Sequence, residues 1–541
     1  MMFGMGEWGP SHQTRKTTSP NTWRRRMLGV IVFLALLGLG NGAAKGESTG
    51  TVAAGVCILF GIACVALPAS LQRRILGGLG IRRRAHRPRK QAVGNDPLET
   101  VRRSAAEHGG GVYLGQTQSG WRYARPERAV LLVGPSRSGK SSGVIVPTVI
   151  AHPGPAVSTS TKPDVARATQ AARARSGRVW VFDPTGTSEP GIGQPLRWSP
   201  IQPAGSWDDA LLVARAMTAG VGAGTTDRTH WSQRAQALLA PMLHGAAIHG
   251  KDMGTVVDWV MRHDLEPAGV LLEDDRCSQL AFSTLLGVHN TEGRERSSIF
   301  SAAADALQAY SSQAALDAAK DPNFDPTEFV CSTDTVYIHA SADEQAAAAP
   351  IVCGLLAHIR RQTYRAHTNQ QLAGRRMLFA LDEVANIAPL EELPQIASEG
   401  AGQGLTLLAA LQDLSQARAR WGHQADGFLT LFGTKLILPG VADTKTLESV
   451  STMLGEYDRQ TVAQTRTSPS MFRTLAGGSG AVPQRGTTVS TQRTRVLSPG
   501  EIANIPAGRA LHLDGVQWEL VAVTLAHNSE PWRTLTTPAA R

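Results

Sequence analysis

The chain has 541 residues, of which 42% are hydrophobic and 18% charged, a composition that fits two or three globular domains and argues against wholesale disorder. Its five cysteines are too few and too scattered for a disulfide framework, and none stands at metal-ligand spacing from a histidine or another cysteine. We therefore expect a reduced, cytosolic body without a structural zinc site.

The net charge of +10 is distributed unevenly along the chain. Residues 1–90 contain 14 of the 54 basic residues and only two of the 44 acidic residues, which leaves 40 basic and 42 acidic residues for the remaining 451 positions. The high isoelectric point therefore belongs to the N-terminal segment, and the body of the protein is not a generally basic nucleic-acid binder.

Two uncharged apolar runs lie within this N-terminal segment. Met27–Gly40, extendable through Ala44, is the first, and Thr51–Leu71 is the second. Each approaches the roughly 17 to 25 residues that a helix needs to cross a bilayer. The alternative for the first run is a cleaved signal peptide, which the second run, only a few residues later, disfavours.

Arginine clusters flank this pair of runs. Arg24–Arg26 precede the first run, and five arginines follow the second at positions 73, 74, 82, 83 and 84, whereas the short connection contains only Lys45 and Glu47. The positive-inside rule then places both ends of the hairpin in the cytoplasm. We expect a two-helix transmembrane hairpin with the bulk of the protein in the cytoplasm.

A phosphate-binding loop follows the first buried strand that the sequence predicts. Ala129–Val133 is a short continuous apolar run, typical of a strand in a parallel sheet, and it leads into a full match to GxxxxGK[ST]. Glycines let backbone amides converge on phosphate oxygens, Lys140 supplies a cation and the Ser141 hydroxyl can ligate Mg²⁺. A glycine-rich turn with an incidental lysine is the alternative. The predicted nucleotide-binding residues are Gly134, Pro135, Ser136, Arg137, Ser138, Gly139, Lys140 and Ser141.

An acidic pair ends a second apolar run. Met377–Leu381 reads as a buried strand and is followed by Asp382 and Glu383. Side chains alternate along a strand, so we expect Asp382 to point toward the metal and Glu383 toward the γ-phosphate, where it would act on the attacking water. A strand that ends in a solvated turn is the alternative, which the preceding phosphate loop disfavours.

Two further runs predict strands. Gly404–Leu411 ends in Gln412, at the position where translocating ATPases place a nucleotide sensor, although a capping or turn residue for the next helix is an equal alternative. Val179–Phe182 predicts another strand, to which no chemistry is assigned.

These residues resemble the type IV coupling proteins of conjugation and type IV secretion, of the TraG/TraD type. The resemblance runs in order from the hairpin to about Leu513, and the continuation of the acidic pair as DEVANIAPL is more specific than the two nucleotide motifs. The segments that carry it are 134–148 (GPSRSGKSSGVIVPT), VWVFDP with RWSPI (197–201), 229–247 (THWSQRAQALLAPMLHGAA), 379–422 and 497–513 (LSPGEIANIPAGRALHL).

The resemblance implies a fold and an activity. The fold is α/β: a P-loop (RecA-like) nucleotide-binding domain with an inserted all-helical domain, preceded by the two-helix transmembrane hairpin. The implied activity is ATP hydrolysis with Mg²⁺ that drives transfer of relaxase-bound DNA or protein into a secretion channel. The implied partners are DNA carried by a relaxase, secretion-channel membrane proteins and membrane lipid, with six identical subunits in the inner membrane.

The predicted domains follow from these features. Residues 207–319 are long, rich in alanine and leucine and helix-periodic, which suits the helical insertion. The full division is 1–26 basic N-terminal tail, 27–71 hairpin, 72–110 basic juxtamembrane linker, 111–206 and 320–515 for the two parts of the ATPase domain, 207–319 insertion and 516–541 C-terminal tail. This chain differs from the family pattern at the hairpin. The connection between the two apolar runs has about six residues, which leaves no room for an extracytoplasmic domain.

An arginine-rich stretch interrupts the second part of the ATPase domain. Residues 459–500 contain six arginines and no acidic residue, amid serine, threonine, glycine and glutamine. Low hydrophobicity with like charge predicts a flexible, solvated loop, and a DNA-contacting loop that faces a central channel is the rival interpretation.

Three functions compete at this point. The favoured one is a coupling-protein ATPase; a septal or chromosome-segregation DNA pump and a membrane scaffold with a decayed ATPase are the alternatives. Intact residues Lys140, Ser141, Asp382 and Glu383 oppose the scaffold. The arginine that completes a neighbouring subunit's site stays open among Arg294, Arg296, Arg418 and Arg420.

Overall fold

The computed structural model describes residues 96–187, 190–221, 228–466 and 485–536. The predicted membrane hairpin at 27–71 and the basic N-terminal tail lie outside these residues. Within the described ranges, none of the helices combines the length and the apolar character that a membrane span requires.

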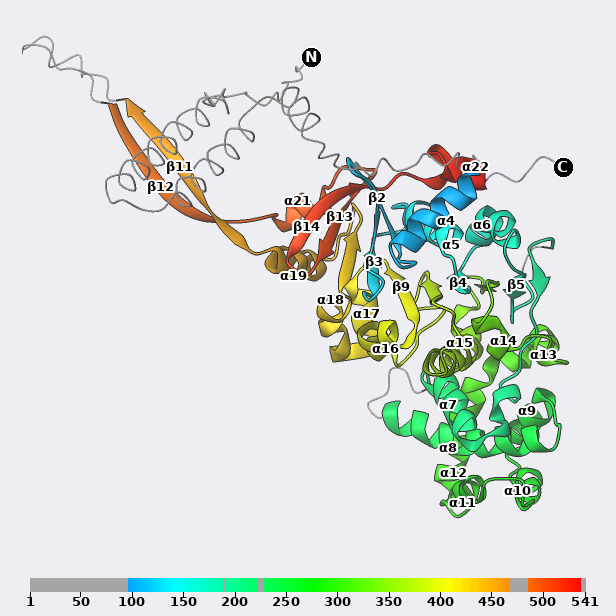
Figure 1. Cartoon of the computed structure of the whole chain (residues 1–541). Helices are drawn as coiled ribbons and strands as arrows, with labels where there is room; N and C mark the ends of the chain where they lie inside the picture. The colour runs from blue at the N-terminus through cyan, green and yellow to red at the C-terminus, as the bar shows by residue number, and fades with distance from the viewer. Residues whose placement is uncertain (1–95, 188–189, 222–227, 467–484, 537–541) are drawn as a thin grey trace, which may run out of the picture. The chain divides into compact units, whose positions relative to one another are not determined.

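A twelve-stranded mixed sheet organises the described residues (Figure 1). Its order is β2-β1-β14-β13-β10-β3-β9-β8-β4-β7-β5-β6, with parallel pairing from β10 to β6 and antiparallel pairing from β10 through β13, β14 and β1 to β2. The strands are β1 (Tyr113–Thr117), β2 (Gly120–Tyr123), β3 (Val130–Val133), β4 (Ala156–Ser160), β5 (Val179–Phe182), β6 (Gln194–Pro195), β7 (Thr335–His339), β8 (Met377–Leu381), β9 (Leu405–Leu411), β10 (Thr434–Ile437), β13 (Arg509–Asp514) and β14 (Gln517–Ala522).

The four strands that the sequence predicts are confirmed as β3, β5, β8 and β9. Every residue of β3, β8 and β9 is buried, because helices cover both faces of the parallel part of the sheet. Along β3, Leu131 and Val133 enter one apolar core, and Val130 and Leu132 enter the other. The sheet thus separates two cores.

Short helices from both ends of the described chain cover the first face. They pack on the core that contains Val130 and Leu132. These elements are α4 (Pro97–Glu107), η1 (Ser141–Ile145), α5 (Val146–Ala151), α6 (Asp164–Ala174), η6 (Ala526–Asn528) and α22 (Trp532–Thr536).

The second face is covered by helices from α14 to α21. They share the core that contains Leu131 and Val133. These elements are α14 (Pro326–Val330), α15 (Gln345–Thr368), α16 (Leu393–Glu399), η4 (Gly400–Gln403), α17 (Leu414–Trp421), η5 (Gly422–Gly427), α18 (Phe428–Leu431), α19 (Thr444–Leu454) and α21 (Pro499–Ala503).

The described residues from η2 to α13 form a group of helices that lies mostly at the bottom of the view in Figure 1. Asp209, in the first turn of α7, lies 3.0 Å from Arg365 and 3.3 Å from Arg361 of α15, which fixes this group to the second face of the sheet. The elements are η2 (Gln202–Gly205), α7 (Trp207–Thr218), α8 (Arg228–Ile248), α9 (Met253–Met261), α10 (Glu266–Leu272), α11 (Gln279–His289), α12 (Gly293–Ala306), η3 (Gln308–Ser311) and α13 (Gln313–Ala319).

Two segments that the sequence assigns to a linker and a tail belong to the folded domain. Within the predicted linker 72–110, α4 begins at Pro97 behind the N-cap Asp96 and buries Leu98 and Val101. Within the predicted tail 516–541, β14 joins the sheet and Trp532 of α22 is 2% exposed. The prediction was wrong for both because each segment gains its burial only from residues that are distant in the sequence.

The predicted flexible loop at 459–500 is also corrected. β11 (Glu456–Arg466) and β12 (Arg485–Arg495) form a two-stranded antiparallel ribbon that projects from the body, and α21 follows (Figure 1). Threonine and valine favour extended backbone, and cross-strand pairing satisfies the peptide groups that face the partner strand without a hydrophobic core. Residues 467–484 lie outside the described part.

Candidate nucleotide-binding site

The loop between β3 and η1 has the backbone conformation of an anion-binding turn. Arg137 and Gly139 adopt left-handed conformations, with φ of 64° and 98°, and a Cβ on Gly134 would stand 2.7 Å from the Ser138 hydroxyl and 2.8 Å from Leu438. A larger residue at position 134 would force Leu438 to move, because the Cβ of Leu438 is fixed to its backbone. Ser138 Oγ is buried and has no hydrogen-bond partner among the described residues.

Lys140 is buried within this loop. Its Nζ donates to the carbonyl oxygens of Gly134 (2.6 Å) and Pro135 (3.1 Å), and the side chain is 6% exposed. Burial lowers the pKa of Lys140, and the nearby carboxylates of Asp382 and Glu383 oppose that shift. The lysine therefore places a positive charge beside the loop amides.

Ser141 and Asp382 join the loop to the end of β8. Ser141 Oγ donates a hydrogen bond of 2.6 Å to Asp382 Oδ2, across 241 residues of sequence. Burial raises the pKa of Asp382, and the hydrogen bond from Ser141 and the charge of Lys140 oppose the shift. A serine hydroxyl beside one carboxylate, next to bound phosphate, is the set of oxygen ligands that Mg²⁺ prefers.

Thr159 is a residue that the sequence analysis missed. Its hydroxyl, at the end of the neighbouring strand β4, donates to the backbone oxygen of Asp382 at 2.9 Å and is fully buried. It holds the end of β8 in place. The only signal in the sequence was its position in a short hydroxyl-rich strand, which gives no hint of the contact.

Glu383 lies beyond the end of β8, in a turn of the backbone. β8 ends at Leu381, and Glu383 adopts a left-handed backbone conformation with φ of 50°. This conformation costs a residue with a side chain on the order of 1 to 3 kcal/mol, and such strain is found mostly at functional sites. A backbone turn, rather than strand alternation, therefore sets where Glu383 stands relative to Asp382.

The environment of Glu383 raises the pKa of its carboxyl group above the ordinary value. Burial raises the pKa of Glu383, the charge of Asp382 raises it further, and Lys140 and a hydrogen bond from the Gln412 side chain oppose the shift. Gln412 follows β9, which lies in the sheet between β3 and β8. Parallel pairing brings the ends of these three strands to one edge, so the loop, the acidic pair and Gln412 meet there.

Residues 523–527, near the C-terminus, also contact the first turn after the phosphate loop. The sequence analysis did not predict this contact. Ser142 Oγ lies 3.4 Å from His527 Nδ1, and a Cβ on Gly139 would stand 3.1 Å from Leu525. A Cβ on Gly143 would stand 2.6 Å from Val523. The sequence carries no motif in this segment, because its place depends on the pairing of β14 with β13.

The loop that begins at Glu383 is held by α17. Trp421 Nε1 donates to Leu390 O at 2.7 Å, and Arg420 donates to Pro389 O at 3.1 Å. The backbone that positions Glu383 is therefore tied to the helix that starts just after Gln412.

The four candidate arginines lie in two regions. Arg418 and Arg420 belong to α17, and Arg418 donates to Asp443 at 2.7 Å. Arg294 and Arg296 belong to α12 of the helical group, where Arg296 donates to His289 O at 2.6 Å and Arg294 is exposed. The structure of one subunit leaves all four open as donors to a neighbour's site.

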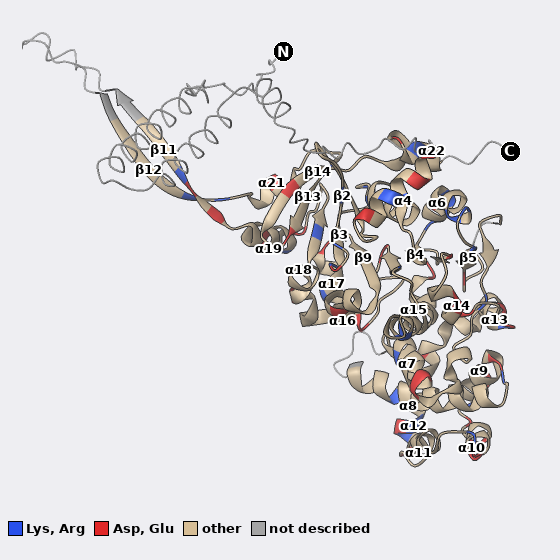
Figure 2. Ribbon diagram, in the orientation of Figure 1, with Lys and Arg blue, Asp and Glu red and all other residues tan. Residues whose placement is uncertain are grey.

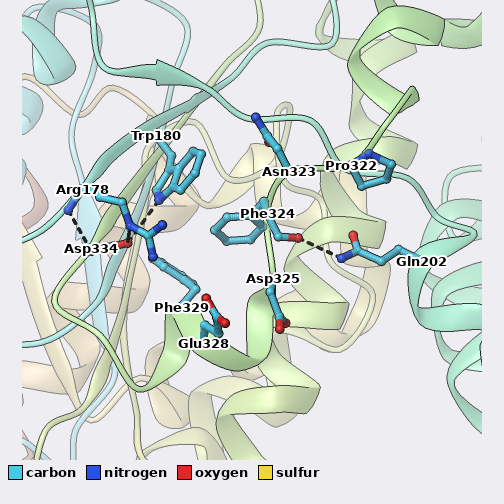
Figure 3. Close-up of a pocket in the computed structure, with 10 residues that line it drawn as sticks. All are labelled: Arg178, Trp180, Gln202, Pro322, Asn323, Phe324, Asp325, Glu328, Phe329 and Asp334. Carbon is cyan, nitrogen blue, oxygen red and sulfur yellow. Dashed lines mark hydrogen bonds and ion pairs between the residues drawn. The ribbon is translucent and has the colours of Figure 1, made fainter.

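A separate pocket of about 250 Å³ lies beside β5 and α14 (Figure 3). Its buried carboxylate, Asp334, accepts hydrogen bonds from the Arg178 backbone, the Arg178 guanidinium and the Trp180 indole, at 2.8, 3.1 and 3.2 Å. The guanidinium of Arg178 also lies 5.3 Å from the Trp180 ring centroid. Because this carboxylate is already neutralised within the fold, we assign the pocket a structural role.

Comparisons with known proteins agree with this arrangement. The family model described as type IV secretory system conjugative DNA transfer matches residues 81–521. The conjugal transfer protein TraG of Escherichia coli is 25% identical over 456 residues, which cover 77% of this chain and 68% of TraG.

Two solved structures of the plasmid coupling protein TrwB are similar in fold. One is in complex with the non-hydrolysable ATP analogue ADPNP and the other with ADP and Mg²⁺. Each has a TM-score of 0.56 and 18% sequence identity, and each match covers 76% of this chain and 89% of TrwB. With an α/β fold of the TrwB type and a family match over most of its length, the chain belongs to the type IV secretory system conjugative DNA transfer family.

Proposed function

We propose that this protein is a membrane-anchored ATPase that couples ATP hydrolysis to the recruitment and transfer of relaxase-bound DNA into a type IV secretion channel. The observation that carries the proposal is the meeting of the glycine-rich loop, Ser141, Asp382, Glu383 and Gln412 at one edge of the sheet. The nucleotide and Mg²⁺ in the TrwB complexes support ATP and Mg²⁺ as the ligands of this edge.

The residues of this chain fit those ligands. The loop amides and Lys140 would hold the phosphates, and the buried, unpartnered hydroxyl of Ser138 lies within the same loop. Ser141 and Asp382 would hold Mg²⁺, which supplies a Lewis acid that neutralises charge on the transferred phosphoryl group. Glu383 would orient the attacking water and take its proton on a carboxylate oxygen, and Gln412 would hold that carboxylate in its ionised form.

ATP turnover by the full chain tests this proposal. Lys140→Ala should abolish nucleotide binding, whereas Glu383→Gln should keep binding and reduce turnover by about a hundredfold or more, because only Glu383 acts on the water. DNA should stimulate the parent protein. Turnover by Glu383→Gln at the parent rate would contradict the assignment of Glu383 as the base. If the parent chain binds no nucleotide, the proposal fails and a membrane scaffold with a decayed ATPase becomes the favoured function.

The membrane anchor is part of the same proposal. The apolar runs at 27–71 and the arginine clusters on either side support an inner-membrane hairpin with both ends in the cytoplasm. A reporter fused after residue 95 should be active in the cytoplasm. Activity of that reporter only outside the cytoplasm, or a mature chain that starts near Lys45, would reject the hairpin.

Six identical subunits, a relaxase and secretion-channel proteins complete the proposal. Membership of the conjugative DNA transfer family supports a role beside the transfer machinery, and an arginine from a neighbouring subunit would complete each site. The mass of the detergent-solubilised chain, alone and on DNA, tests the oligomer.

A further inference from the structure

The ribbon of β11 and β12 is a small sheet of its own. It is separate from the twelve-stranded sheet, and its ladder runs through eleven register pairs from Glu456↔Arg495 to Arg466↔Arg485. At about 3.4 Å per residue, each strand extends for roughly 37 Å. An ion pair of 2.6 Å between Arg495 and Glu448 of α19 anchors its base. Figure 1 shows the ribbon leaving the rest of the described chain near α19, with its far end free of other described elements.

Both long edges of the ribbon are open. In an antiparallel pair, about half of the peptide groups of each strand point away from the partner strand. Neither β11 nor β12 pairs with a further strand within the described ranges. A two-stranded ribbon alone is marginally stable in water, and an exposed edge is a template for another strand. The outward peptide groups of both strands therefore call for a partner.

The described part of the ribbon carries little that would block such pairing. Proteins usually protect an exposed edge with charges, proline or a bulge. Residues 460–463 of β11 and 487–492 of β12 include neither a charged residue nor a proline, and the eleven pairs keep one register. Their threonine and valine residues favour extended backbone. Val462 and Val489 are the large apolar side chains of this middle part, which is too little for insertion into a lipid surface.

The two edges differ in charge at the base of the ribbon. β11 carries Glu456 and Asp458 there, followed by Arg459, and β12 carries Arg493 and Arg495, as the red and blue segments near the base in Figure 2 show. Arg493 lies 3.7 Å from Glu456 but is 80% exposed, and Asp458 is exposed and forms no ion pair with a described residue. The β11 edge of one copy therefore suits the β12 edge of another, whereas two β12 edges would bring four arginines together.

A second copy of the chain meets these requirements in a ring. When ribbons related by rotation lie side by side, β11 of one runs antiparallel to β12 of the next, which is the pairing that the ribbon makes within one chain. In the same register, Glu456 would oppose Arg495 and Asp458 would oppose Arg493 of the next copy. A shift of two residues in either direction keeps every side chain on its face and still leaves one acid opposite an arginine.

We infer that the ribbons of neighbouring subunits pair edge to edge, β11 of one with β12 of the next. Each contact satisfies the outward peptide groups of one edge of each ribbon, and repetition around a ring leaves no open edge. Six ribbons of two strands would then close into one antiparallel sheet with both faces largely polar. The inference rests on the proposed function, because that function supplies the ring of identical subunits.

Disulfide formation between single-cysteine variants of the full chain, co-expressed and purified in detergent, tests this pairing. One chain carries Thr461→Cys on β11, and the other carries Thr488→Cys, Ser490→Cys or Gln492→Cys on β12, all exposed and on one face of the ribbon. The three partners cover the register of the ribbon and shifts of two residues either way. Because each chain has one added cysteine, every new disulfide joins two subunits. On oxidation, one of the three mixtures should give a dimer at least about fivefold above background.

Three controls set that background. The parent without an added cysteine reports on its own five cysteines. Thr461→Cys alone should stay at background, because β11 strands of neighbouring ribbons would be two strand spacings apart, roughly 10 Å, which is too far for a disulfide. Val270→Cys mixed with Leu280→Cys should do the same, since these positions are 61% and 65% exposed but lie on α10 and α11.

A charge exchange between copies is the second test. Glu456→Lys/Asp458→Lys chains and Arg493→Glu/Arg495→Glu chains should each need an about threefold or higher concentration to assemble, because like charges would meet at each contact. A mixture of the two should assemble like the parent, since each variant's β11 then faces a complementary β12. The damage within each ribbon is the same alone and in the mixture, so recovery reports on pairing between copies.

Three results would overturn the inference. The first is background disulfide in all three mixtures of an assembled oligomer. The second is a strong dimer of Thr461→Cys alone, which would place two β11 edges together, and the third is a charge mixture that assembles no better than its components. A chain that stays monomeric, alone and on DNA, would instead contradict the ring of the proposed function. Light scattering on the same samples distinguishes the two failures.

Discussion

The carboxyl group of Glu383 is subject to opposing influences that set the pH at which it can act as a base. Burial and the charge of Asp382 raise its pKa above the ordinary value of 4.5, and Lys140 and Gln412 lower it. A base must be ionised to accept a proton, so turnover is complete above the raised pKa and is lost as the pH falls through it. The charge of Asp382 is coupled to that of Glu383. The fall of turnover at low pH, the acid limb of the pH profile, therefore reflects both carboxyl groups.

Gln412→Ala should therefore move the acid limb of ATP turnover to higher pH. The variant loses a hydrogen bond to the ionised form of Glu383, which raises the pKa of that carboxyl further. The measurement is kcat as a function of pH for the parent and the variant, with the nucleotide Kd as a check on binding. An acid limb that keeps its position would show that Gln412 does not contact Glu383 in the working enzyme.

Gly134→Ala should disrupt the phosphate loop. The added Cβ would stand 2.7 Å from Ser138 Oγ and 2.8 Å from Leu438 Cβ, and overpacking of this kind costs about 1 to 3 kcal/mol. Because the clash lies within the loop itself, we expect nucleotide affinity to fall about tenfold or more, measured by calorimetry. Gly402→Ala is the matched control, since a Cβ at that position would meet no described neighbour within 4 Å, and it should bind nucleotide like the parent.

At the scale of elements, α17 connects two parts of the site. The helix starts after Gln412, and its last residue, Trp421, donates to Leu390 in the loop that begins at Glu383. Lys140 and Ser141 belong to another element, η1 and the loop before it. Substitutions in α17 should therefore lower the rate of ATP hydrolysis more than they lower the affinity for nucleotide.

Trp421→Phe should lower kcat while the Kd for nucleotide stays near that of the parent. The change leaves the Leu390 carbonyl without its partner, which costs about 1 to 3 kcal/mol and loosens the loop that holds Glu383. Trp180→Phe is the matched control, because it removes an indole hydrogen bond to Asp334 beside β5. The control should lose comparable thermal stability and keep its kcat, and an equal fall of kcat in both variants would contradict a positioning role for Trp421.

The elements that the sequence predicts are those whose signal is local. β3, β8 and β9 are buried on both faces and so form continuous apolar runs, and the motif after β3 fixes the place of Lys140. β14 and the ribbon could not be predicted this way, because β14 alternates in burial and the ribbon has no core face. Their structure comes from pairing with strands that the sequence does not mark.

The same distinction applies to the site. The motif spacing identifies Lys140 and Ser141, and the apolar run that ends in an acidic pair, taken together with that motif, predicts Asp382 as their partner. The left-handed turn at Glu383 and the contact of His527 with Ser142 depend on tertiary packing, which no short motif records.

At the scale of the whole molecule, the proposed ring predicts that one subunit does not suffice for rapid hydrolysis. A transferred phosphoryl group needs its charge neutralised, and in ring ATPases an arginine from the adjacent subunit supplies that charge. Arg418 is engaged by Asp443 of its own subunit, and Arg294 lies on the helical group, so a neighbour could present either region to the site.

Specific ATPase activity should therefore rise with protein concentration and with DNA that gathers subunits into a ring. Assembly follows mass action, so dilution should lower the turnover per subunit together with the fraction of oligomer, measured by light scattering on the same samples. Adding Glu383→Gln subunits to dilute parent should raise the turnover per parent subunit, because the variant keeps the arginine that a neighbouring site would use. Constant activity per subunit across a wide dilution, with monomer throughout and no response to DNA, would show that each chain hydrolyses ATP with its own residues alone.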